Sequence, residues 1–148
     1  MIGVRNRIEV MHGVNLDQLG RRNPAHYGGL NFDRLEQHIG DFARELGLTT
    51  RFFQTNSEAE FVGHLHRLED LADGIVINPG AWTHYSWAIR DALEIAGLPA
   101  VEVHLSDVAR REAWRQHSVI SELCVATVAG QGPDGYRTAL ERLGKELP

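Results

Sequence analysis

Two kinds of hydrophobic pattern alternate along the chain. Five short apolar runs, rich in Val, Ile or Phe, have the composition and length that are typical of β-strands. These runs cover residues 7–11, 48–53, 74–78, 100–104 and 124–129. Between them, apolar residues recur every three or four positions, as on the buried face of an amphipathic helix.

The helical spacing occurs in four segments. Their apolar positions run from Phe32 to Leu46, from Phe61 to Leu71, from Trp87 to Ala96, and through a last segment that contains Leu140 and Leu143. Gly47 and Gly97 directly follow the first and third segments, and a glycine at that place commonly ends a helix.

The order of these segments is that of an α/β protein. Strand and helix alternate five times, which predicts a parallel sheet with helices on both faces. Runs 74–77 and 100–103 are the most continuous, as expected for strands at the centre of a sheet. We predict a single flavodoxin-like domain over residues 1–148, with five parallel strands in the order 2-1-3-4-5.

This architecture predicts the position of a binding site. Ligands of open α/β sheets bind beyond the carboxyl ends of the strands, near the point where the strand order reverses. The turns that follow the first four strands all carry amide or imidazole groups, and they are residues 12–16, 54–58, 78–84 and 104–107. The first, third and fourth of these turns should be neighbours.

The segment after the first strand is unusually long. No apolar period is visible from His12 to Leu30, and structureless stretches of that length in compact domains are often lids. We interpret it as a mobile lid. Its candidate hinges and functional side chains are Gly20, Gly28, Gly29, Arg21, Arg22 and Tyr27.

Composition narrows the class of protein. The chain has 148 residues, 43% of them hydrophobic, and a net charge of −5, which does not favour nucleic acid or an anionic membrane as a partner. One cysteine, Cys124, cannot form an internal disulfide. Neither a secretory signal nor an apolar run near the ~18 residues of a membrane span is present, so we expect a soluble cytoplasmic protein.

Eight histidines raise the question of a metal site. His64 and His66 are two apart on a predicted helix and point in different directions. We expect most of the histidines at the surface, and only His84 and His104 close together, without a zinc-type carboxylate or Cys pattern. No metal is predicted. A glycine-rich nucleotide motif is also missing, so no feature supports a nucleotide or flavin cofactor.

Acid–base chemistry has better support. His104 ends a buried strand, and Glu102 points to the same side of that strand, where a carboxylate can orient an imidazole or raise its pKa. His104 could equally be a packed polar residue. Asn15 and Asn78 are either turn residues or hydrogen-bonding groups for a ligand.

Two further groups have both a functional and an ordinary interpretation. Arg111 and Arg115 are four residues apart, on one face of a helix, and either bind a carboxylate or belong to a solvated helix face. Tyr27 lies near Arg22 in the sequence. A tyrosine becomes a usable base only where cations stabilise its phenolate. Otherwise Tyr27 is a common loop residue.

Taken together, these stretches resemble the type II 3-dehydroquinate dehydratase family. The resemblance extends from about Ile8 to Leu143. It is carried, in order, by Gly13-Val14-Asn15-Leu16, Leu19-Gly20-Arg21-Arg22-Asn23-Pro24 with Tyr27-Gly28, Phe53-Gln54-Thr55-Asn56-Ser57-Glu58, Asp73 to Ile77, Asn78-Pro79-Gly80-Ala81-Trp82-Thr83-His84, Arg90-Asp91-Ala92, Glu102-Val103-His104-Leu105-Ser106 and Gly132-Pro133-Asp134-Gly135-Tyr136.

The resemblance implies a flavodoxin-like enzyme without metal or cofactor that converts 3-dehydroquinate to 3-dehydroshikimate by anti elimination of water through an enolate. Tyr27 would be the base, held by Arg22. His104 would be the acid, supported by Asn15 and Glu102.

The same resemblance implies the residues that bind the carboxylate and hydroxyls of the substrate. These are Asn78, His84, Arg115 and the backbone N–H groups of Leu105 and Ser106, with Arg111 close by. Asp91 would reach the site of a neighbouring subunit, because members form trimers that assemble into dodecamers. The implied pathway is the shikimate pathway or quinate breakdown.

The chain departs from the usual family pattern at His12, Val14, Asn23, Asp107, Ala109 and Val119. These departures leave a second hypothesis open, a non-catalytic paralogue that binds a ligand of the same pathway. An unrelated flavodoxin-like binding module is a third.

Overall fold

The computed structural model describes residues 5–27 and 29–147, which form one five-stranded parallel sheet in the order β2-β1-β3-β4-β5. The predicted strands and their order are confirmed. The strands are β1 (Arg7–His12), β2 (Thr49–Gln54), β3 (Gly74–Asn78), β4 (Ala100–His104) and β5 (Ala126–Ala129). As expected for central strands, every residue of β3 and β4 is buried.

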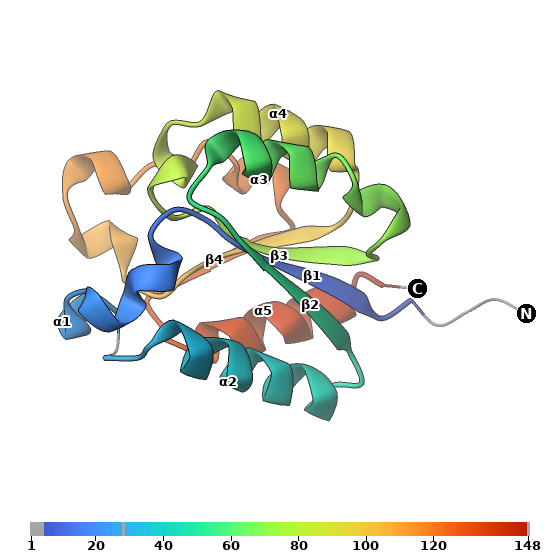
Figure 1. The fold of residues 1–148 in the computed structure, drawn as a ribbon, viewed down its shortest axis with the longest axis horizontal. Helices are drawn as coiled ribbons and strands as arrows, with labels where there is room; N and C mark the ends of the chain where they lie inside the picture. Colours follow the sequence, from blue (N-terminus) through green and yellow to red (C-terminus); the bar gives the residue numbers. More distant parts are fainter. Residues whose placement is uncertain (1–4, 28, 148) are drawn as a thin grey trace, which may run out of the picture.

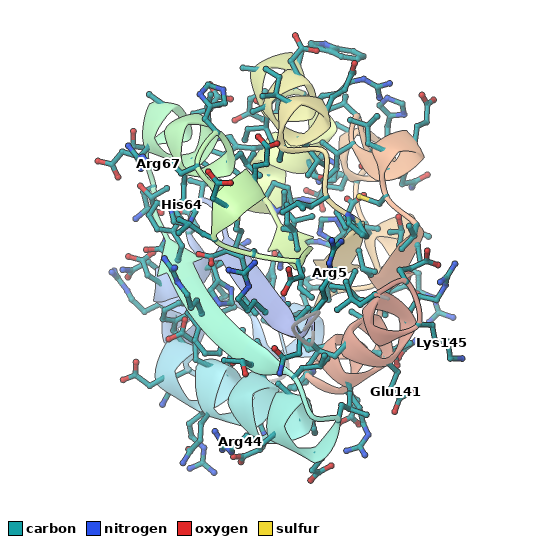
Figure 2. The ribbon with its side chains drawn as sticks, turned by 90° about the vertical axis from the view of Figure 1, so that its right-hand side faces the viewer. Arg5, Arg44, His64, Arg67, Glu141 and Lys145 are labelled. Atoms are coloured by element: carbon teal, nitrogen blue, oxygen red, sulfur yellow. The ribbon has the colours of Figure 1, made fainter. Side chains whose placement is uncertain are left out.

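Helices cover both faces of the sheet (Figure 1). One face carries α3 (Glu58–Leu65) and α4 (Trp87–Ala96), and the other carries α2 (Phe32–Glu45) and α5 (Asp134–Gly144). Figure 2, which looks at the twisted sheet from one end, shows the two layers on opposite sides. The side chains of Asn31, Ser57 and Ser86 accept backbone hydrogen bonds in the first turns of α2, α3 and α4, which explains where these helices begin.

The two helix layers enclose separate hydrophobic cores. Val10 of β1 packs on the side of α2 and α5, whereas its neighbour Met11 packs on the side of α3 and α4. Because side chains alternate along a strand, Glu9 shares the α3 side with Met11 and His12 shares the α2 side with Val10. All strands end at the left of Figure 1, where the connecting segments of the site gather.

The segment after β1 is more ordered than its sequence suggested. It contains a 3-10 helix, η1 (Leu16–Arg21), and a short helix, α1 (Pro24–Tyr27). Leu16 and Leu19 are both buried. The structureless interpretation was therefore wrong, because turns this short do not show a helical apolar period. Of the hinge candidates, Gly28 lies outside the described residues.

The connection between β4 and β5 also differs from the prediction. It contains three 3-10 turns, η4 (Val108–Arg110), η5 (Ala113–Arg115) and η6 (Ser121–Leu123), in place of the fifth helix that a strict alternation requires. Arg111 follows η4 in an extended conformation and Arg115 ends η5, so the two arginines do not share a helix face. Similarly, α3 ends at Leu65, and the predicted continuation forms a separate turn, η2 (Leu68–Asp70).

The prediction that most histidines lie at the surface holds only in part. His12 and His64 are buried at 0% and 8% exposure. His12 lies edge-on to the ring of Phe32, and its Nε2 is 3.3 Å from Glu36 Oε2. His64 stacks on Phe53. His64 also contacts the Glu9 carboxylate at 2.7 Å, whereas neither ring nitrogen of His12 has a hydrogen-bond partner among the described residues.

Candidate active site

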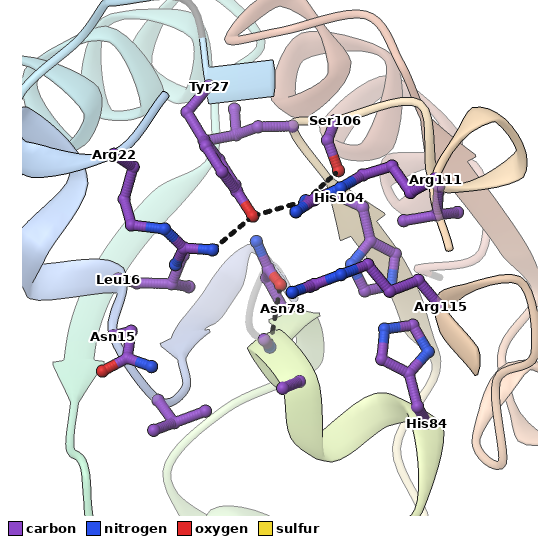
Figure 3. Close-up of a pocket in the computed structure, with 15 residues that line it drawn as sticks. Asn15, Leu16, Arg22, Tyr27, Asn78, His84, His104, Ser106, Arg111 and Arg115 are labelled. Atoms are coloured by element: carbon purple, nitrogen blue, oxygen red, sulfur yellow. Dashed lines mark hydrogen bonds between the residues drawn. The ribbon is translucent and has the colours of Figure 1, made fainter. Parts of the chain in front are cut away.

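A pocket opens at the carboxyl ends of β1, β3 and β4, where the strand order predicted it (Figure 3). All but two of the predicted site residues line this pocket. They are Asn15, Arg22, Tyr27, Asn78, His84, His104, Leu105, Ser106, Arg111 and Arg115. The exceptions are Glu102, which lies behind His104, and Asp91, which is exposed on α4.

Tyr27 is held by two arginines. Its hydroxyl oxygen accepts hydrogen bonds from Arg22 Nη2 and Arg111 Nη1, both at 2.6 Å. Figure 3 shows the two guanidinium groups approaching this oxygen from opposite sides. Guanidinium groups donate and never accept, so the arrangement suits an oxygen that carries negative charge. Only 8% of Tyr27 is exposed, so it is not the exposed loop residue of the ordinary interpretation.

Arg111 is closer to the proposed base than sequence reasoning suggested. The resemblance placed it only near the site, yet it contacts the Tyr27 hydroxyl directly and also lies 3.4 Å from Ser106 Oγ. The contact joins residues 84 positions apart. No local spacing signals such a pair, because it depends on β1 and β4 ending at the same edge of the sheet.

His104 and Glu102 form the predicted pair. His104 Nε2 donates to Glu102 Oε2 at 2.5 Å, and Glu102 is completely buried. Burial by itself would raise the pKa of the Glu102 carboxyl. Hydrogen bonds from His104, Thr83 and Ser118 outweigh this effect, and the pKa is lowered from its ordinary value.

Sequence reasoning missed Thr83 and Ser118. Thr83 Oγ1 lies 2.6 Å from Glu102 Oε2, and Ser118 Oγ lies 2.9 Å and 3.0 Å from the two carboxylate oxygens. Thr83 stands beside His84 in one of the motifs, which was an available but unspecific signal. Nothing in the local sequence indicated Ser118.

His84 lies next to His104, as predicted from the strand ends. The ring centroids are 6.4 Å apart, with the planes 18° from parallel. His84 Nδ1 donates to the His117 carbonyl oxygen at 2.7 Å. Burial, together with the positive charges of His104 and Arg115, lowers the pKa of His84. A neutral His84 with its proton on Nδ1 offers Nε2 as a hydrogen-bond acceptor.

Asn78 and Asn15 approach the pocket from the ends of β3 and β1. Asn78 is buried. Its Oδ1 accepts the N–H of Gly80, and its Nδ2 lies 3.5 Å from the Tyr136 hydroxyl. Asn15 has a left-handed backbone (φ 68°), so it is a turn residue as well as a pocket residue. The two turns touch at Gly13, where an added Cβ would lie 2.2 Å from the Pro79 carbonyl oxygen.

The departures from the family pattern lie mostly outside the pocket, and Val14 alone among them lines it. Asn23 caps α1 by accepting the Ala25 N–H. Asp107 forms an ion pair with Arg110, Ala109 is exposed, and Val119 is buried in the α3–α4 core.

Among the described residues, no group of three or more His, Cys, Asp or Glu side chains is arranged to hold a metal ion. In the same residues, no helix is both long and apolar enough to cross a membrane.

Fold and site together define a class of protein, a flavodoxin-like α/β protein with an arginine-bound tyrosine and a carboxylate–imidazole pair in one pocket. The family model described as "Dehydroquinase class II" matches residues 6–144. The chain therefore belongs to the class II dehydroquinase family.

Relatives and solved structures agree with this assignment. The chain is 46% identical over 141 residues to a 3-dehydroquinate dehydratase of Thermotoga maritima, covering 95% of this chain and 96% of the relative. A type II dehydroquinase structure from Propionibacterium acnes superposes with a TM-score of 0.90 at 42% identity, covering 97% of this chain and 99% of the other. A 3-dehydroquinate dehydratase-like protein from Bifidobacterium longum superposes with a TM-score of 0.70 at 32% identity, over 95% and 97% of the two chains.

Proposed function

We propose that this protein is a hydro-lyase that converts 3-dehydroquinate to 3-dehydroshikimate by anti elimination of water. The observation that carries the proposal is that one pocket contains both a tyrosine oxygen bound by two guanidinium groups and a histidine paired with a buried carboxylate. This reaction needs such a base and such an acid.

In the first step, the Tyr27 phenolate removes the C2 proton. Arg22 and Arg111 hold the phenolate oxygen in place, and the C–H electron pair moves into the enolate of the neighbouring ketone. General base help of this kind contributes roughly 10²–10⁴-fold to the rate.

In the second step, the enolate collapses to the ketone, its C=C electron pair forms the C1=C2 double bond, and the C1–O bond breaks. His104 uses Nε2 to donate to Glu102, which leaves Nδ1 to protonate the departing hydroxyl as water. Asn15 and Glu102 support this acid, Glu102 through its direct hydrogen bond.

Substrate binding uses the remaining polar groups of the pocket. Arg115 and Asn78 suit the carboxylate and hydroxyls, and His84 offers Nε2 as an acceptor for a hydroxyl. The backbone N–H groups of Leu105 and Ser106 complete the set. The proposal includes no metal and no cofactor.

The alternative is a non-catalytic paralogue that binds a ligand of the same pathway. The departures at His12, Val14 and Asp107 motivate it, but only Val14 lines the pocket, and none of the proposed catalytic side chains is replaced. The relatives' names also favour the enzyme.

The test is a turnover assay. Purified protein given 3-dehydroquinate should generate the conjugated enone absorbance of the product. Tyr27→Phe should abolish turnover with the fold intact by circular dichroism, whereas Tyr85→Phe, at a residue that is 57% exposed and outside the pocket, should leave turnover unchanged.

Four outcomes would contradict the proposal. A folded wild-type protein without signal above an empty-vector preparation rejects the enzyme, and calorimetric ligand binding without turnover favours the paralogue. A flavin spectrum in the purified protein would indicate the unrelated binding module. Near-normal turnover of Tyr27→Phe rejects Tyr27 as the base.

Assembly and cellular role are part of the same proposal. Trp87 and Ile95 are 62% and 66% exposed, and with Asp91 they are spaced four apart on the outer face of α4. This face suits a subunit interface in which Asp91 reaches a neighbouring site, in trimers that form a dodecamer.

We propose a single cytoplasmic catalytic domain acting in the shikimate pathway or in quinate breakdown. Light scattering and an Asp91→Asn assay test the assembly.

A further inference from the structure

The carboxylate of Glu102 has more hydrogen-bond donors than one histidine requires. Oε2 accepts from His104 Nε2, and the hydroxyls of Thr83 and Ser118 contact the same carboxylate. An ionised carboxylate is only an acceptor, so both hydroxyl groups must donate to it.

The hydroxyl hydrogens of Thr83 and Ser118 have few acceptors other than Glu102. Ser118 Oγ accepts the backbone N–H groups of Ile120 and Ser121, which occupy its acceptor positions and leave its single hydrogen for Glu102. Thr83 is 1% exposed, and its 2.6 Å contact with Glu102 Oε2 is shorter than its 3.3 Å contact with Ser118 Oγ.

A second hollow of about 250 Å³ lies beside this cluster, and Thr83, Glu102, His104 and Ser118 help to line it. Glu102 nevertheless has no solvent-exposed surface. The two hydroxyl groups therefore supply the donors that water would otherwise provide, and they do so in fixed positions.

We propose that Thr83 and Ser118 are positioning residues for the acid: their hydroxyl groups hold Glu102 ionised and oriented on Nε2 of His104, and so make His104 a stronger proton donor to the leaving hydroxyl. This inference rests on the proposed dehydration, in which His104 is the acid.

The direction of the effect follows from charge. The pair is neutral overall when it holds one proton and has a charge of −1 when it holds none. Hydrogen-bond donors to the carboxylate stabilise the −1 state more, so they lower the apparent pKa of the pair. Removal of one hydroxyl should raise that apparent pKa and weaken the acid.

The sharpest variant is Thr83→Val, which keeps the shape of the side chain and removes only the hydroxyl. We expect the alkaline limb of the kcat–pH profile to move up by about one pH unit and kcat to fall about three- to tenfold, with KM nearly unchanged. Thr83→Ser should restore both values. Ser121→Ala, which removes a nearby hydroxyl that does not contact Glu102, is the matched control.

An NMR titration of the Glu102 carboxyl gives a readout that does not depend on turnover, because the Thr83 hydroxyl is one of the donors that lower the pKa of Glu102. Thr83→Val should move the midpoint of this titration up. Should Thr83→Val fail to fold, Ser118→Ala compared with Ser118→Thr makes the same test.

An unchanged midpoint and profile in folded hydroxyl-deletion variants would overturn this inference while leaving the dehydratase proposal intact. An inactive wild type whose Glu102 midpoint still responds to Thr83→Val would instead reject the dehydratase alone. Loss of activity that Thr83→Ser does not restore would mean that Thr83 acts only through packing.

Discussion

Two buried glutamate–histidine pairs lie on the α3–α4 side of the sheet. In Glu102–His104, Nε2 and Oε2 are 2.5 Å apart, and in Glu9–His64 the same two atoms are 2.7 Å apart. Both carboxylates are at most 1% exposed. The pair geometry alone would not reveal which of them performs chemistry.

Their surroundings differ sharply. Glu102 receives two hydroxyl donors, and His104 lines the pocket. Glu9 has one oxygen, Oε1, without a hydrogen bond anywhere in residues 5–27 and 29–147, and the nearest cation, Arg51 Nε, is 3.5 Å away.

The imidazole of the second pair is also enclosed. The ring of Phe53 stacks on His64 with the centroids 3.8 Å apart and the planes 2° from parallel. His64 lies on α3 above the sheet (Figure 2). Under our proposal, the Glu102–His104 pair serves as an acid because His104 lines the pocket, whereas the Glu9–His64 pair joins α3 to β1.

The largest expected difference between the pairs is in turnover. His104→Gln should lower kcat by roughly 10²–10⁴-fold, because it removes the proton donor. His64→Gln should leave kcat within about threefold in folded protein, since the contribution of an acid does not depend on this residue. Steady-state assays of both variants measure this, and equal losses would erase the distinction.

For the free energy of unfolding, we expect the larger loss in the Glu9–His64 pair and the smaller loss in the Glu102–His104 pair. His64→Ala leaves buried Glu9 without its imidazole partner and should lower the free energy of unfolding by about 3–5 kcal/mol. His104→Ala should cost about 1–3 kcal/mol, because two hydroxyl groups still bind Glu102. Urea titration compares them, with exposed His66→Ala as the control. A larger loss for His104→Ala would contradict our assignment of roles.

Low pH should destabilise the proposed catalytic pair, Glu102–His104, through protonation of Glu102. Its pKa in the folded protein is below the 4.5 of an ordinary glutamate, so folding releases protons and stability rises with pH in that range. The stabilisation is complete above about pH 4.5 and is lost as the pH falls through the folded pKa.

Glu102→Gln should therefore flatten the dependence of the melting temperature on pH below 4.5. The pKa of Glu112 is also lowered, chiefly by its hydrogen bond with Arg115, but its side chain is 53% exposed. Glu112→Gln should change the curve much less, because solvent screens an exposed pair. Identical curves for the wild type and Glu102→Gln would show that Glu102 is not held ionised.

The smallest change in stability is expected at Arg51, which lies beside the Glu9–His64 pair. Arg51 has a side chain that is 54% exposed, and it only approaches Glu9. Arg51→Gln should lower the free energy of unfolding by less than about 1 kcal/mol, less still in high salt. A loss comparable to that of His64→Ala in urea titration would mean that Arg51 stabilises Glu9 as much as His64 does.

The proposed catalytic pair, Glu102–His104, could be predicted because its two residues are close together in the sequence. Glu102 and His104 are two residues apart on a strand, so alternation alone places them on one side. The parallel sheet also followed from short-range patterns, since parallel strands need crossovers and crossovers leave a helical period, whereas the strand order came from the number of strand–helix units in a chain of this length. Thr83, Ser118 and Arg111 could not be predicted, because they meet their partners only after the turns have folded.

For the Glu9–His64 pair, the sequence could predict the burial of His64 but not its partner. Phe61 and Leu65 mark the buried face of α3, and His64 follows Phe61 by three positions, so its burial could have been predicted from helical spacing. Its partner Glu9 is 55 residues away on β1. Periodicity predicts which face of an element is buried, but not which residue of another element it will meet.

The joint hold of Arg22 and Arg111 on the Tyr27 oxygen has a thermodynamic consequence. Folding brings these guanidinium groups, and Arg115 nearby, to one pocket of a protein whose net charge is −5. Repulsion between the guanidinium groups opposes their approach, and the favourable free energy of folding in the rest of the protein offsets this repulsion. An anionic ligand relieves the repulsion, so it binds the native chain in preference to the unfolded one and raises the melting temperature with its concentration. The melting temperature therefore measures ligand binding in the pocket even when no turnover occurs.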